Sequence, residues 1–79
     1  MLSEEQRRAY DSAIDGAFLR ANQNIASARA HRLTAKQKEL IARAESFIAQ
    51  ARETRKVDPA TAQSLAQRAE LLTREVLNE

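Results

Sequence analysis

The sequence has no cysteine and no tryptophan, and its 79 residues include only one glycine, one proline and one histidine. Without cysteine the chain forms no disulfide, and a lone histidine provides no ligand set typical of a transition-metal site. A single glycine also excludes the glycine-rich loops that bind phosphates or dinucleotides. We therefore expect no metal and no other cofactor.

Long hydrophobic runs are missing as well. The longest apolar stretches span three or four residues, such as 16–19, whereas a membrane-spanning helix needs about 20 apolar residues. The N-terminus lacks the basic, apolar and small-residue order of a secretory signal peptide. We expect neither a membrane span nor a signal peptide in this chain, and the compartment stays open.

The ionisable side chains do not form a recognisable catalytic set. His31 is the only ordinary candidate for a general base, and we interpret it as a solvent-facing residue near a helix end. Acidic residues mostly alternate with basic ones, as in the pairs Glu39 with Arg43 and Glu70 with Arg74, whose spacing stabilises exposed helices. We predict that the protein is not an enzyme.

Three helix-capping signals divide the chain. Ser3 precedes Gln6, and Thr34 precedes Gln37, with the spacing of a capping box, while Asp58 stands before Pro59 as N-cap and first helical residue. Between these signals apolar residues recur at intervals of three and four. The pattern predicts one all-α domain over residues 1–79, with helices at about 3–32, 35–55 and 59–77. Short loops make consecutive helices antiparallel, as a bundle or hairpin with a long first helix.

Gly16 lies inside the first predicted helix and leaves two alternatives. The helix bends there or runs on continuously, and we favour the continuous helix. A continuous first helix overhangs the two shorter ones, so one of its ends stays uncovered or contacts a second chain. This difference in length favours self-association.

The predicted core is thin. The chain is 43% hydrophobic, but 16 of its residues are alanine, and a domain of this size buries only about 60% of its unfolded surface. We therefore expect a homo-oligomer or a protein partner. Leu19 and Leu71 fall outside the main apolar stripes of their helices, and they are the candidate contact surface.

Asn24 lies at the margin of the apolar stripe of the first predicted helix. A polar side chain in that place either fixes the register of a helical interface or is an exposed amide. We favour the exposed amide.

Positive charge is distributed unevenly along the chain. Residues 16–38 include no acidic residue and five basic ones. The residues near the first inter-helix turn form a candidate basic patch that would attract nucleic-acid phosphates or an acidic protein surface. No aromatic residues alternate with them, which disfavours base stacking. The patch consists of Arg29, His31, Arg32, Lys36 and Lys38.

Residues 42–77 resemble a single tetratricopeptide-like helical hairpin and are similar to alanine-rich bacterial helical hairpins. The resemblance rests on Ala44, Phe47 and Ala51 before the 56–59 turn, followed by small and medium residues such as Ala62 and Ala69. The family's first-helix Trp, Leu-Gly and Tyr are absent, and no second repeat follows. The resemblance implies hairpin packing and protein interaction, with no functional residue transferred.

We therefore expect a non-catalytic helical module for protein–protein interaction or oligomerisation, or part of a larger bacterial protein with that role. The alternative is a small nucleic-acid-binding helical protein that uses the basic patch between Arg29 and Lys38.

Overall fold

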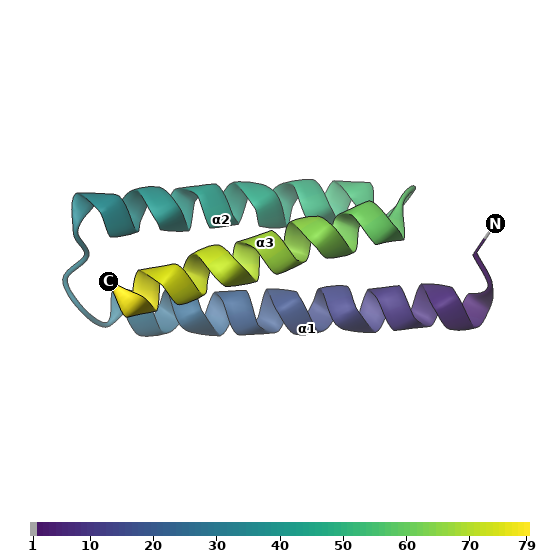
Figure 1. Ribbon diagram of the computed structural model, residues 1–79, viewed down its shortest axis with the longest axis horizontal. Helices are drawn as coiled ribbons and strands as arrows, with labels where there is room; N and C mark the ends of the chain where they lie inside the picture. Colours follow the sequence, from purple (N-terminus) through teal and green to yellow (C-terminus); the bar gives the residue numbers. More distant parts are fainter. Residues whose placement is uncertain (1) are drawn as a thin grey trace.

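The computed structural model describes residues 2–79 and shows an all-α bundle of three helices (Figure 1). They are α1 (Glu4–Arg29), α2 (Ala35–Thr54) and α3 (Pro59–Asn78). The chain reverses direction at each turn, so consecutive helices are antiparallel and α1 and α3 run the same way. The predicted fold class is confirmed.

The caps explain where each helix begins. The side chains of Ser3 and Thr34 accept hydrogen bonds from the backbone N–H groups three residues later. In turn, the side-chain oxygens of Gln6 and Gln37 accept hydrogen bonds from the backbone N–H groups of Ser3 and Thr34. Asp58 accepts from the Thr61 backbone N–H, with proline in the first turn. All three predicted starts are confirmed.

The end of α1 differs from the prediction. The helix ends at Arg29 instead of continuing to about residue 32. Leu33 turns inward to pack against the core cluster that includes Ile25 and Leu40, and a helix continuing to residue 32 would leave too few residues to reverse the chain before Thr34 caps α2. Packing of this leucine therefore decides the helix end.

The path of α1 is continuous through Gly16, as the favoured alternative predicted. At about 1.5 Å per residue, α1 is roughly 39 Å long and the other helices are roughly 30 Å. Residues 4–9 of α1 are all exposed, and fully buried positions begin only at Ile14. The first turns of α1 extend past most of the core.

Helix α3 packs against both α1 and α2, whereas α1 and α2 approach each other closely at few positions. Most of its buried side chains are small, so the two neighbouring helices come close to its backbone. Eight of the fifteen buried apolar residues in the described chain are alanines, which confirms the thin core. The buried alanines are Ala17, Ala21, Ala28, Ala44, Ala51, Ala62, Ala66 and Ala69.

Longer side chains bridge α1 and α2. The Arg55 guanidinium contacts Asp15 at 2.9 Å and Asp11 at 3.2 Å. The guanidinium carbons of Arg52 and Arg55 lie 5.6 and 6.0 Å from the Phe18 ring centre, within the range of a cation–π interaction. The hydrogen bond to Asp15, despite partial burial, raises the pKa of Arg55.

Candidate functional site

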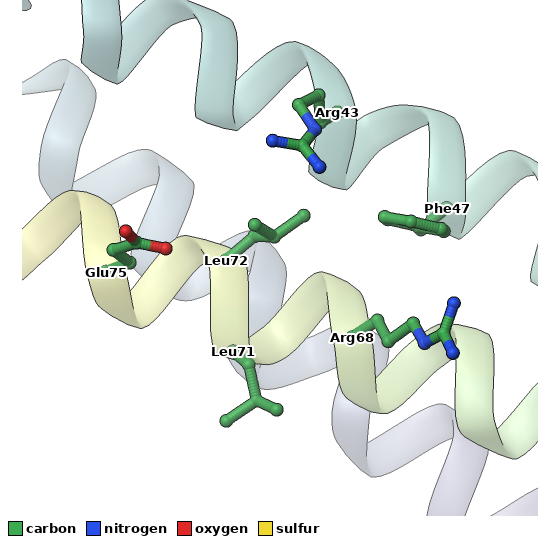
Figure 2. Close-up of a pocket in the computed structure, with 6 residues that line it drawn as sticks. All are labelled: Arg43, Phe47, Arg68, Leu71, Leu72 and Glu75. Carbon is green, nitrogen blue, oxygen red and sulfur yellow. The ribbon is translucent and has the colours of Figure 1, made fainter.

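Leu71 is the most exposed large apolar residue of α3. Its side chain is 59% exposed, although it lies in the middle of the most heavily packed helix. Leu72 points from α3 toward Arg43 and Phe47 of α2, while Leu71 points to the other side of the helix (Figure 2). Leu71 borders two surface hollows, one toward α2 and one toward α1.

The hollow toward α2 has an apolar floor and a charged rim. Phe47 and Leu72 are half-buried and pack against the core without closing the surface above them. The hollow measures about 310 Å³, and Leu71 forms part of its wall. The rim consists of Arg43, Arg68 and Glu75.

These three rim residues form no salt bridge with any residue between 2 and 79. Glu39 and Arg43 form no salt bridge within residues 2–79, so the prediction that they pair is wrong. All three rim side chains belong to exposed residues. Because no salt bridge holds them, these side chains can approach opposite charges on another molecule.

The hollow toward α1 is built on an ion cluster. Glu70 is only 7% exposed, and its Oε2 atom lies 3.0 Å from Arg20 Nε and 2.6 Å from Arg74 Nη2. The predicted Glu70–Arg74 pair is present, but Glu70 is buried at the α1–α3 interface instead of lying on a solvated face. A buried carboxylate requires such partners, because an unpaired charge there is costly.

Gly16 makes space for this cluster. A Cβ atom at position 16 would lie 3.2 Å from Arg20 Nη1, tighter than an ordinary contact. The glycine therefore gives the Arg20 guanidinium room to lie along α1 and reach α3.

The favoured interpretation of Asn24 as an exposed amide is wrong. Asn24 is half-buried, and its Nδ2 donates to Thr73 Oγ1 on α3 at 3.1 Å. The Thr73 hydroxyl is fully buried and donates to the backbone oxygen of Glu70 at 2.7 Å. These bonds fix the register of α1 and α3 within one chain, which is the alternative that the sequence left open.

Leu19, the other candidate contact residue, is 60% exposed on α1. It lines neither of the two hollows beside Leu71. The structure therefore does not unite Leu19 and Leu71 in either of these hollows.

The basic patch lies at the turn between α1 and α2, but acidic residues form salt bridges with two of its members. Arg29 Nη2 lies 3.3 Å from Glu45, and Lys36 Nζ lies 3.0 Å from Glu79. The hydrogen bond that Lys36 donates to the Glu79 carboxylate raises the pKa of Lys36. His31, Arg32 and Lys38 are exposed and form no salt bridge within the described chain.

No group of three or more His, Cys, Asp or Glu side chains among residues 2–79 is arranged to hold a metal ion. In the same range, no helix has the length and apolarity needed to cross a membrane. His31 lies just after the last turn of α1 and is exposed.

Sequence reasoning identified Leu71 but not the residues around it. Arg43 and Arg68 look like ordinary exposed helix residues, and only the pairing of α2 with α3 places both beside one hollow. A usable signal was the position of Arg68 and Glu75, three residues before and four residues after Leu71 on one helix face.

The chain matches no protein-family model, and neither the curated proteins nor the solved structures include a significant match to it.

Proposed function

We propose that this protein is a non-catalytic protein-interaction module that docks its partner on the outer face of α3. We define this face as Gln67, Arg68, Leu71, Arg74 and Glu75. The carrying observation is the exposed Leu71 side chain between two hollows, beside rim charges that form no salt bridge within the described chain. Interfaces of this kind combine a central apolar anchor with a polar rim.

The antiparallel α2–α3 hairpin agrees with what the tetratricopeptide-like resemblance implied for packing. The resemblance of residues 42–77 to that family stays a prediction. The proposal rests on the α3 surface and the two hollows beside it.

A photo-crosslinking amino acid at position 71, introduced in cells that produce the protein, tests this proposal. Position 19 is the matched control, because Leu19 and Leu71 are almost equally exposed. We expect a discrete protein adduct from position 71 and none from position 19. Adducts from neither position, or equal adducts from both, would contradict the proposal.

The basic patch supports the nucleic-acid alternative less well. Glu45 and Glu79 lie within salt-bridge distance of two of its four permanent cations, which weakens the field that would attract phosphates. The remaining exposed groups are His31, Arg32 and Lys38.

The alternative predicts nucleic-acid binding that falls steeply with salt. It also predicts that the binding weakens when Arg29, Arg32, Lys36 and Lys38 are neutralised together. Binding that ignores both changes would exclude a role for this patch.

A further inference from the structure

The outer surface of α3 carries a regular row of exposed residues at alternating steps of four and three. This spacing keeps the row on one side of a helix and is the spacing of a coiled-coil seam. Leu71, at its centre, is the only apolar member. The row consists of Ser64, Arg68, Leu71, Glu75 and Asn78, all exposed in the structure.

The charges of this row are complementary to themselves when the row is reversed. In two antiparallel copies of α3 related by a two-fold axis between residues 71 and 72, Arg68 of each copy faces Glu75 of the other. Two equivalent ion pairs then form around a central leucine. A parallel arrangement would instead place Arg68 opposite Arg68 and Glu75 opposite Glu75, which is repulsive.

The same axis gives the Leu71 side chain a place to bind. It brings position 71 of one copy level with position 72 of the other, so the two Leu71 residues lie within about one residue rise, ~1.5 Å, of each other along the helix axis. The two exposed leucines then pack together between the ion pairs. Such an interface is isologous, because the same surface serves on both sides.

We propose that the partner on the outer face of α3 is a second copy of this chain, docked antiparallel about a two-fold axis near Leu71. This inference rests on the proposed function and specifies its partner. Arg68 and Glu75 set the orientation, and Leu71 is the apolar anchor. The interface has only one central leucine from each copy, so the dimer is weak and depends on concentration.

Sedimentation equilibrium from micromolar to millimolar concentration tests the inference on the full chain. We expect a monomer–dimer equilibrium that Leu71→Asp abolishes and Leu19→Asp leaves unchanged. The charge reversals Arg68→Glu and Glu75→Arg each replace two attractive pairs by two repulsive ones, so each weakens dimerisation by at least about tenfold.

Combining the charge reversals provides the decisive readout. The double variant Arg68→Glu/Glu75→Arg regains the dimer, because both pairs are restored with their signs exchanged. An equimolar mixture of the two single variants also regains it as a heterodimer. Helicity measured in parallel shows that every variant is folded, which the exposure of these positions leads us to expect.

Several results would overturn the inference. The first is a chain that stays monomeric at millimolar concentration. The second is a double variant that dimerises no more tightly than the single variants. The third is a loss of dimerisation on Leu19→Asp equal to that on Leu71→Asp. If position 71 then still crosslinks to a different protein, the proposed function stands without the dimer. If position 71 crosslinks to nothing, both fail.

Discussion

At several positions of this bundle, the size of the side chain matters for packing as much as its polarity does. Gly16 leaves space for the Arg20 guanidinium, which in turn contacts the buried Glu70 carboxylate. Ala69 is fully buried in the core cluster where the helices come together. Periodicity marks such positions as small or apolar, but it does not say which neighbour their size accommodates.

Replacing Gly16 by alanine has two opposed effects. Alanine is favoured over glycine in a helix by about 1 kcal/mol, while the new Cβ pushes the flexible Arg20 guanidinium away from its position. We expect Gly16→Ala to stabilise the chain by less than about 1 kcal/mol, and by nearly the full amount when Arg20→Ala is also present. Urea unfolding measures both gains, and equal gains would show that Arg20 does not constrain position 16.

Enlarging Ala69 overpacks the core. We expect Ala69→Leu to lower the free energy of unfolding by about 1–3 kcal/mol, because extra methyl groups must be fitted between closely packed helices. The same substitution at Ala49, which is exposed on α2, is the control and costs little. Equal melting temperatures for the two variants would mean that the neighbouring helices do not pack closely around Ala69.

At the scale of the helices, local signals in the sequence explain most of what the structure shows. The three N-caps and the apolar stripes were read directly, since both depend on residues within one or two turns. The end of α1 was missed because it depends on where Leu33 packs. The Asn24–Thr73 and Arg20–Glu70 contacts were missed because they join residues about 50 positions apart.

The cap of α3 makes a pH-dependent contribution to stability. Hydrogen bonds from the Thr61 hydroxyl and backbone N–H lower the pKa of Asp58 below its ordinary value of 3.8. A lowered folded-state pKa gives stability that is present above pH 3.8 and is lost as pH falls through the folded-state pKa. The ionised cap therefore stabilises α3 at neutral pH.

Asp58→Asn keeps a good N-cap but does not titrate. We expect the melting temperature of the natural chain to fall relative to that of Asp58→Asn as the pH drops below 3.8. A constant difference across the titration would show that the Asp58 charge does not contribute.

Across the whole molecule, α3 holds the bundle together, because α1 and α2 each pack extensively on it and little on one another. The sequence predicted three antiparallel helices but not this hierarchy. The apolar stripes of the three helices have the same period and a similar composition, so they do not predict which helices pack together. The surroundings of Leu71 were unpredictable for the same reason, since they combine side chains of α1, α2 and α3.

Fragments test this hierarchy. We expect a fragment of residues 1–57, which lacks α3, to lose most of its helicity, because isolated helices of this length are marginal in water. A fragment of residues 33–79 keeps the α2–α3 contacts and retains more helix per residue. Far-UV circular dichroism compares them, and a 1–57 fragment at least as helical as 33–79 would contradict the central role of α3.

The position of α3 after α1 and α2 in the sequence affects how the protein is made. The ribosome produces α1 and α2 first, and their apolar faces have no extensive contact until residues 59–78 have emerged. The bundle therefore folds after synthesis has passed α3, and the nascent chain exposes Ile14, Phe18 and Ile48 until then. Any delay in translating α3 lengthens the time in which chaperones or aggregation can capture the chain.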